Sequence, residues 1–171
     1  MKKLFLTATT VLLAACQSTP DAPLRATAGL QPTKGSKAFG EATFEEVDGK
    51  VRVIVFAQGL KANAVHGFHI HEVGDCGSGD GMSTKGHFNP HGKPHGNPSG
   101  AERHAGDLPA LNAGKDGRAK IDVTLDIITV RAGPASIVGR GLIIHADPDD
   151  YKTQPTGNAG ARIACGVIKA E

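Results

Sequence analysis

Seven side chains of this sequence have the types and the spacing of ligands for two metal ions. They are six histidines and one aspartate: His69, His71, His87, His95, His104, Asp107 and His145. The first two lie in Gly-Phe-His-Ile-His-Glu at 67–72, an apolar and β-branched segment that favours a strand. Alternate residues of a strand point to the same face, about 7 Å apart, so both imidazoles can reach one metal ion.

The middle of this set falls in a segment that cannot form a regular strand or helix. Residues 86–100 read Gly-His-Phe-Asn-Pro-His-Gly-Lys-Pro-His-Gly-Asn-Pro-Ser-Gly, and glycine, proline and asparagine at this density mark a loop. Long loops without secondary structure of their own are usually functional or disordered, so the histidines indicate that a metal holds this one. His145 ends the apolar run at 141–144, and only the fold can bring it to His69 and His71.

Short strands separated by turns must position these side chains. A strand at 51–56 follows the turn dipeptide Asp48-Gly49, and 41–46 is its expected hairpin partner. No convincing amphipathic helix is present. The chain has 171 residues with 23 glycines, 10 prolines and no tryptophan, which predicts one compact all-β domain, a sandwich or a barrel. The further strand candidates lie at 64–71, 118–125, 137–138, 142–145 and 162–168.

Four longer segments resemble the bacterial Cu/Zn superoxide dismutases. They read G-F-H-I-H-E-V-G-D-C at 67–76, G-H-F-N-P at 86–90, E-R-H-A-G-D-L at 102–108 and G-N-A-G-A-R-I-A-C-G-V-I at 157–168. The resemblance extends from about residue 25 to the C-terminus. It implies an eight-stranded Greek-key β-barrel with long metal-binding and substrate-guiding loops at 73–107 and 146–161. The reaction implied is the dismutation of superoxide to oxygen and hydrogen peroxide, in which copper carries the electron.

The same resemblance implies a role for each candidate residue, with one copper and one zinc per subunit. His87 would bridge the metals and pass a proton to the nascent peroxide, and Arg162 would hold the anionic substrate. Asp149 would orient ligands of both metals, with Asp147 and Asp150 as nearby alternatives. Copper would be bound by His69, His71, His87 and His145, and zinc by His87, His95, His104 and Asp107.

Two histidines remain outside these sets. We expect His66 to form a hydrogen bond within the barrel rather than to bind a metal. His91 lies in the metal loop and could replace a neighbour as ligand. The interval of eight residues from His87 to His95 is the family interval, which favours His95.

The N-terminus has the features of an export signal. Lys2 and Lys3 precede an apolar run at 4–15 that is too short to span a bilayer, so 1–15 is predicted to be a signal peptide. Leu-Ala-Ala-Cys at 13–16 resembles a bacterial lipobox, which implies a lipidated Cys16, a tether at 16–24 and a domain at 25–171. An ordinary signal peptide is the alternative. The resemblance to lipoproteins, with Gln17 instead of an aspartate after the cysteine, implies the outer membrane, with the domain in the periplasm.

With Cys16 lipidated, Cys76 and Cys165 remain as a candidate disulfide, which an oxidising periplasm allows. Removing Lys2 and Lys3 from the 19 basic residues leaves 17, equal to the 17 acidic residues. Neither a basic run nor an aromatic platform for nucleic acid is present. The competing function is a non-catalytic periplasmic lipoprotein that buffers copper or zinc. The sequence leaves open whether the protein is a monomer or a homodimer.

Overall fold

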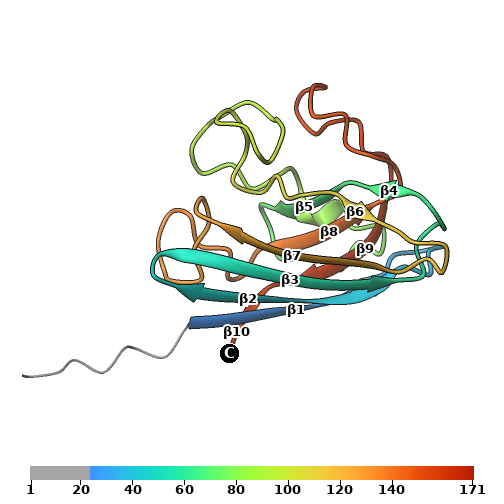
Figure 1. The fold of residues 1–171 in the computed structure, drawn as a ribbon, viewed down its shortest axis with the longest axis horizontal. Helices are drawn as coiled ribbons and strands as arrows, with labels where there is room; N and C mark the ends of the chain where they lie inside the picture. Colours follow the sequence, from blue (N-terminus) through green and yellow to red (C-terminus); the bar gives the residue numbers. More distant parts are fainter. Residues whose placement is uncertain (1–23) are drawn as a thin grey trace, which may run out of the picture.

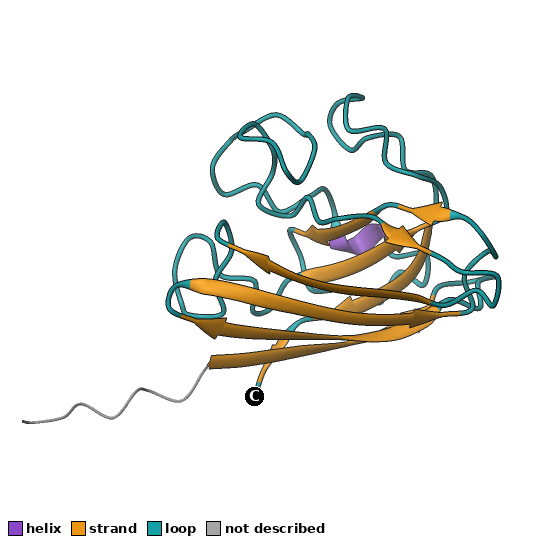
Figure 2. Cartoon of the chain, viewed as in Figure 1, coloured by secondary structure: helices purple, strands orange, loops and turns teal. Residues whose placement is uncertain are grey.

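The computed structural model describes residues 24–171. The predicted signal peptide, Cys16 and all of the tether except Leu24 lie outside the described residues. The described part consists of strands and loops with one short 3₁₀ turn, as Figure 2 shows, so the all-β prediction is confirmed. No helix within residues 24–171 has the length and apolar character needed to cross a membrane.

Most of the strands belong to one curled antiparallel sheet. Eight strands of the described chain form it in the order β5-β8-β9-β1-β2-β3-β7, with β10 paired to β1. Figure 1 shows β5, β8 and β9 lying over β1, β2 and β3. The elements are β1 (Leu24–Pro32), β2 (Phe39–Val47), β3 (Lys50–Gln58), β4 (Val65–His66), β5 (Phe68–His71), η1 (Met82–Thr84), β6 (Leu111–Asn112), β7 (Ala119–Leu125), β8 (Gly141–His145), β9 (Arg162–Val167) and β10 (Lys169–Ala170).

A second, two-stranded sheet of β4 and β6 joins the edges of the large one. β4 leads into β5 and β6 leads into β7, and β5 and β7 are the two edge strands. Pairing of Val65 with Asn112 therefore brings these edges together and helps to close the barrel. The connections from β3 to β5 and from β7 to β8 pass between strands that are not neighbours, as in a Greek-key barrel.

The two halves of the barrel are buried in different ways. β1, β2 and β3 alternate between buried and more exposed residues, because one face packs on the core and the other meets water. Every residue of β5 and β8 is buried, and Figure 1 shows long loops above these strands. Polar side chains on β5 and β8 are therefore enclosed. The buried residues that β1, β2 and β3 contribute to the core include Ala26, Ala28, Leu30, Phe44, Val51, Val53 and Val55.

Three parts of the structure differ from the strand predictions. The segment 64–71 is divided at Gly67, whose amide donates to the carbonyl of Asp147 (2.8 Å). The strand predicted at 137–138 is wrong: Ile137 is fully buried, but a single bridge between Thr129 and Ser136 precedes it and Gly139 turns the chain at φ 80°. The sequence does not predict β1, because its inward positions are alanines and a leucine rather than β-branched residues.

Two long loops rise from the same side of the barrel (Figure 1). One connects β5 to β6 and the other connects β8 to β9, where the sequence predicts them. A disulfide joins Cys76 in the first loop to Cys165 in β9, with the two Cα atoms 5.9 Å apart, so the predicted pairing is confirmed. This bond ties the start of the first loop to the barrel.

Candidate metal centre

Four histidines from three parts of the chain meet beneath the loops. His69 and His71 alternate along β5, and β8 pairs with β5 so that His145 at its end comes close to them. His87 arrives from the first loop through a short antiparallel bridge to His71. One donor atom from each of the four rings lies within 4.8 Å of the others, and all four residues are buried. We call this set the four-histidine cluster.

Backbone carbonyls orient two of these rings. The Nδ1–H of His71 donates to the carbonyl of Lys85 (2.8 Å), and the Nδ1–H of His145 donates to the carbonyl of Gly160 (3.2 Å). With the proton on Nδ1, each ring presents the lone pair of Nε2 to the centre of the cluster. The two Nε2 atoms are 3.4 Å apart. Outer hydrogen bonds of this kind are typical of histidines that bind metals.

A second set is built around one carboxylate. Oδ1 of Asp107 lies 2.9 Å from Nδ1 of His87, 3.0 Å from Nδ1 of His95 and 3.4 Å from Nδ1 of His104. Its other oxygen accepts from the amides of Gly96 (3.1 Å) and His104 (2.8 Å), which fixes the carboxylate. One donor atom from each of the four side chains lies within 4.8 Å of the others. We call this set the histidine–aspartate cluster; His87 belongs to both.

Buried nitrogens without partners indicate that both clusters fit metal ions. Within residues 24–171, Nδ1 of His69, Nε2 of His87 and Nδ1 of His104 are buried and accept or donate no hydrogen bond. Such groups are rare because burying an unpaired polar atom costs free energy. Three of the seven ligand residues share this feature, and all three atoms face a cluster with a complete set of donors. A metal ion in each cluster would satisfy them.

Asp149 connects the two clusters directly. Its Oδ2 accepts from Nε2 of His69 (2.7 Å), and its Oδ1 accepts from Nε2 of His95 (2.9 Å) and from the amide of Tyr151 (2.7 Å). The approach is so close that a Cβ at Gly157 would lie 1.9 Å from Oδ1. Asp149 therefore holds one ring from each cluster.

The alternatives to Asp149 have other partners. The backbone carbonyl of Asp147 accepts from Gly67, and the exposed carboxylate of Asp150 accepts from Thr153. The sequence does not predict the role of Gln154, whose side chain bonds both the amide and the carbonyl of His95 at 2.9 Å. No sequence signal identifies it, because the contact depends on how the second loop folds over the first.

Burial keeps three histidines of the four-histidine cluster neutral. It lowers the pKa of His71 well below its usual value, the pKa of His87 to about 4 and the pKa of His145 to about 3. Nearby imidazoles add to this effect in all three cases. Neutral imidazole is the form that binds a metal, so these rings are ready to do so at neutral pH.

The carboxylates have the opposite influence on His95. Burial lowers its pKa, but hydrogen bonds to Asp107 and Asp149 outweigh burial and raise the pKa to about 9. Burial also disfavours both carboxylate ions, yet hydrogen bonds from the surrounding histidines hold the pKa of Asp107 and of Asp149 well below the usual value. Two anions therefore balance the positive charge that a metal or a proton brings.

Arg162, the first residue of β9, is held against the first loop. Its Nη1 donates to the carbonyl of Gly81 (2.7 Å) and to Oγ1 of Thr84 (2.8 Å), and its Nη2 donates to the carbonyl of Lys85 (2.6 Å). Nε and one hydrogen of Nη2 have no acceptor within residues 24–171, so the guanidinium can still bind an anion. Burial lowers its pKa from 12.5, but the group remains charged at neutral pH.

The four-histidine cluster opens at this arginine. A cavity of about 340 Å³ is lined by His71, His145 and Arg162, and by Met82 and parts of the second loop. A fixed positive group thus stands beside two imidazoles with converging lone pairs. This arrangement can bind a small anion next to a metal.

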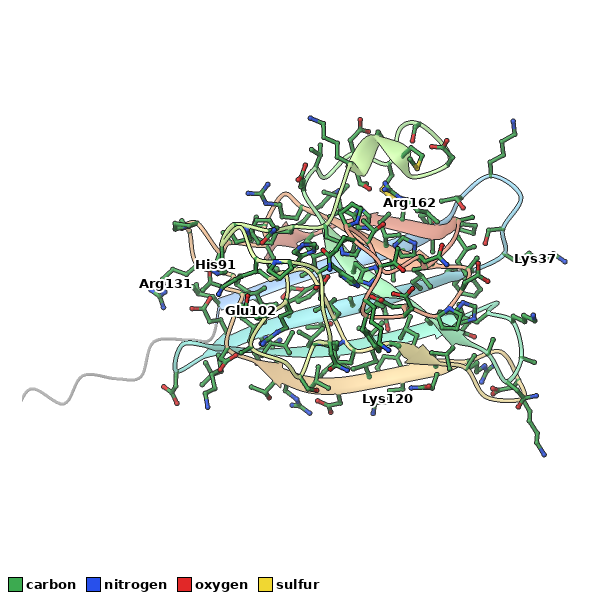
Figure 3. All side chains as sticks on the ribbon, turned by 90° about the horizontal axis from the view of Figure 1, so that it is seen from above. Lys37, His91, Glu102, Lys120, Arg131 and Arg162 are labelled. Carbon is green, nitrogen blue, oxygen red and sulfur yellow. A yellow bond between two sulfur atoms is a disulfide. The ribbon has the colours of Figure 1, made fainter. Side chains whose placement is uncertain are left out.

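The two remaining histidines, His66 and His91, belong to neither cluster. His66 is buried, and its Nδ1–H donates to the carbonyl of His145 (2.8 Å). His91 is exposed on the first loop and belongs to neither set. Figure 3 shows it apart from Arg162. The structure therefore favours His95 over His91, as the sequence does.

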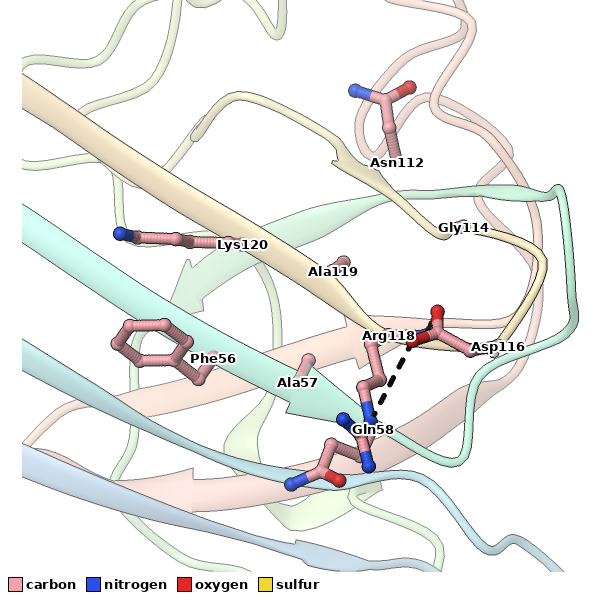
Figure 4. Close-up of a pocket in the computed structure, with 9 residues that line it drawn as sticks. All are labelled: Phe56, Ala57, Gln58, Asn112, Gly114, Asp116, Arg118, Ala119 and Lys120. Carbon is pink, nitrogen blue, oxygen red and sulfur yellow. Dashed lines mark hydrogen bonds and ion pairs between the residues drawn. The ribbon is translucent and has the colours of Figure 1, made fainter.

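A separate cavity lies on the outer face of β3 and β7 (Figure 4). It measures about 600 Å³, and its lining includes Phe56, Arg118 and Lys120 but no histidine or cysteine. Arg118 pairs with Asp116 there at 3.8 Å. This cavity does not have the ligands for the chemistry of the two clusters.

Comparison with known proteins agrees with this geometry. The family model for copper/zinc superoxide dismutase (SODC) matches residues 38–168. Two superoxide dismutases [Cu-Zn] of Aquifex aeolicus (strain VF5) are 42% and 41% identical over 150 residues, which is 85% of this chain and 87% and 88% of the relatives. One from Brassica juncea is 48% identical over 130 residues, 72% of this chain and 84% of the relative.

A solved structure shows the same fold. The clock protein EA4, whose crystal structure is known, is 41% identical to this chain in sequence. The two structures align over 90% of this chain and 98% of the EA4 chain, with a TM-score of 0.78. The family uses copper and zinc, and both clusters here have complete sets of donors for metal ions. The chain belongs to the copper/zinc superoxide dismutase family.

Proposed function

We propose that this chain converts superoxide to oxygen and hydrogen peroxide with one copper in the four-histidine cluster and one zinc in the histidine–aspartate cluster. Family membership supports the reaction and the two metals. The observation that carries the assignment is that two complete donor sets share one histidine, His87.

The chemistry of the donors supports this division of the metals. Four imidazole nitrogens suit copper(II), whereas three histidines and a carboxylate form a closed tetrahedral set of the kind that structural zinc takes. Only the four-histidine cluster opens on the cavity with Arg162. The metal that meets substrate must therefore be in that cluster.

Bound copper would supply the one-electron oxidation of one superoxide and the one-electron reduction of the next, which no side chain of the site can perform. Arg162 binds and orients the anion, because its guanidinium is fixed by three hydrogen bonds and keeps free N–H groups. Burial of the surrounding histidines excludes water from all but the open side.

His87 is the residue that can move a proton. Its Nδ1 lies 2.9 Å from Asp107 in the histidine–aspartate cluster, and its buried Nε2 has no partner within the described residues. The ring can therefore hold a proton at Nε2 and release it to the peroxide product without losing its position. The overall reaction consumes two protons for two superoxide ions, and His87 delivers one of them.

The alternative function, non-catalytic storage of copper or zinc, is less well supported. A storage site needs donors but does not need a fixed anion-binding group at its mouth. Arg162 occupies that place with three hydrogen bonds to the first loop, and the curated relatives are superoxide dismutases.

Two matched variants test the assignment. His145→Ala removes a ligand of the four-histidine cluster only, and His104→Ala removes a ligand of the histidine–aspartate cluster only. We expect the first variant to lose copper and activity while it keeps zinc, and the second to lose zinc. Metal content by mass spectrometry and superoxide decay would be measured together. Loss of zinc from His145→Ala with copper retained would contradict the assignment.

We further propose that the protein is exported and anchored to the outer membrane through Cys16, with the domain at 25–171 in the periplasm. The support is the sequence alone: Lys2 and Lys3, the apolar run at 4–15 and the lipobox-like segment at 13–16. The mass of the N-terminal peptide should carry acyl chains that disappear in Cys16→Ser. An unmodified Cys16 in the mature protein would overturn the anchor.

A further inference from the structure

A methionine stands at the mouth of the four-histidine cluster. Met82 lines the same cavity as His71, His145 and Arg162. Its exposure of 60% is the largest among the exposed large hydrophobic residues of the described chain. It is also the only methionine of the sequence besides Met1. A side chain this exposed contributes little to the core, so packing does not explain its presence.

The backbone fixes Met82 in this place. Its amide donates to Oδ1 of Asp80 (2.9 Å), and its carbonyl accepts from the amide of Lys85 (3.1 Å). The neighbouring carbonyl of Gly81 receives hydrogen bonds from both Arg162 and Thr84. Figure 3 shows Arg162 next to this turn. The bonds that position the arginine therefore position the methionine as well.

A thioether adds a property that the histidines lack. Imidazole binds copper and zinc alike, whereas the soft sulfur of methionine selects copper(I). The cavity also contains the positive guanidinium of Arg162, which repels a cation, while the carboxylate of Asp80 lies on the amide side of Met82. A neutral, soft donor can hold copper(I) in such a place through bonding instead of charge.

We propose that Met82 is the first ligand of copper(I) on its way into the four-histidine cluster. The ion binds to Sδ at the mouth of the cavity, and the lone pairs of Nε2 of His71 and His145 then replace the sulfur. Neither an electron nor a proton moves in this exchange of ligands. The inference rests on the proposed function, in which the four-histidine cluster is the copper site.

The rate of copper uptake tests this role. The full-length chain, loaded with zinc and free of copper, is mixed without oxygen with a coloured copper(I)–chelator complex, and the loss of colour is followed. Met82→Leu keeps the shape but removes the sulfur, and we expect uptake of copper(I) to slow about tenfold, the effect of losing one weak ligand. Uptake of copper(II) and the final copper content should not change.

Phe39→Leu is the matched control, because Phe39 is exposed (45%) on β2 and does not line the cavity. A second measurement uses methionine labelled with ¹³C at the methyl group. In His145→Ala, which cannot complete the copper set, one equivalent of copper(I) should shift the Met82 resonance, identified by its absence in Met82→Leu.

The outcomes separate the two proposals. If the unaltered chain takes up copper and Met82→Leu does so at the same rate, or the Met82 resonance does not shift, the role of Met82 is overturned and the proposed function stands. If the unaltered, zinc-loaded chain binds no copper, the proposed function itself fails.

Discussion

The two clusters share His87 but are held by different parts of the molecule. Three ligands of the four-histidine cluster, His69, His71 and His145, lie on β5 and β8, which are paired strands of the barrel. All four ligands of the histidine–aspartate cluster lie on the loop between β5 and β6. Strands place the first cluster, whereas the second cluster helps to hold the loop that carries it.

This difference separates the tasks of the two metals. A ladder of backbone hydrogen bonds fixes the positions on β5 and β8 whether or not a metal is bound. The loop has no such ladder, and its shape depends on side-chain bonds such as those from Gly96 and His104 to Asp107. A site for chemistry is therefore built on the rigid part, and a structural metal orders the part that covers it.

The largest expected effect comes from cutting the covalent link between these two regions. The Cys76–Cys165 bond encloses 89 residues in sequence separation, and closing loops of this size stabilises a protein by about 4–5 kcal/mol in the chain-entropy model. In urea titrations of the metal-free protein, the free energy of unfolding of the double variant Cys76→Ser, Cys165→Ser should be lower than that of the unaltered chain by this amount. A loss below about 1 kcal/mol would show that the loop is held without the bond.

Severing the connection between the clusters should have the next largest effect. Asp149→Asn removes the charge that holds His69 and His95, and loss of such an orienting group typically weakens metal binding about 10–100-fold. Competition with chelators measures the affinity for each metal. Asp147→Asn removes the same charge two residues away, where the structure gives the exposed side chain no hydrogen bond, and should leave both affinities unchanged. Equal effects of the two variants would contradict the bridging role.

A smaller effect is expected at the mouth of the four-histidine cluster. Hydrogen bonds to a charged group contribute about 1.5–3 kcal/mol, so Arg162→Ala should lower the rate constant for superoxide at least about tenfold. Copper and zinc content should not change. Arg118→Ala, just before β7 in the separate cavity, is the control, and Arg162→Lys should restore part of the rate. An unchanged rate constant in Arg162→Ala would contradict the role of Arg162 in binding superoxide.

The pH dependence of stability should separate the two clusters in the metal-free protein. The pKa of His87 is lowered to about 4 and that of His145 to about 3. The unfolded chain thus binds more protons up to pH 6.5, and stability rises with pH there. The pKa of His95 is raised to about 9, so its contribution is complete below pH 6.5 and is lost toward pH 9.

Thermal unfolding from pH 3 to pH 10 measures this profile. We expect maximum stability near pH 6.5 without metals. Zinc should abolish the fall toward pH 9, because His95 is then a neutral ligand. A fall that persists unchanged with zinc bound would place the effect outside the histidine–aspartate cluster.

The sequence predicts strand-borne features better than loop contacts. His69 and His71 are predictable because alternation in a strand determines which side chains share a face. The break at Gly67 is not, because it depends on a hydrogen bond to Asp147, eighty residues further on. The strand β1 is missed because small residues such as Ala26 and Ala28 give a weak strand signal, although they alternate correctly.

In the site, the choice of ligands could be predicted but their supports could not. The family resemblance selects Asp149 from three nearby aspartates, and the structure gives the contacts that distinguish it. The carbonyl of Lys85 and the amide of Gln154 have no signature, because any residue offers a carbonyl and any loop can carry a glutamine. Their roles arise only from the path of the loops across the barrel.

The rate of superoxide decay per bound copper is the most direct test of the assigned activity. The zinc-loaded chain would be titrated with copper up to one equivalent, and decay followed at each point. We expect the rate to rise in proportion to copper and to approach the diffusional ceiling of about 10⁸–10⁹ M⁻¹s⁻¹. Full occupancy of the four-histidine cluster without acceleration would contradict the account and favour a metal-storage protein.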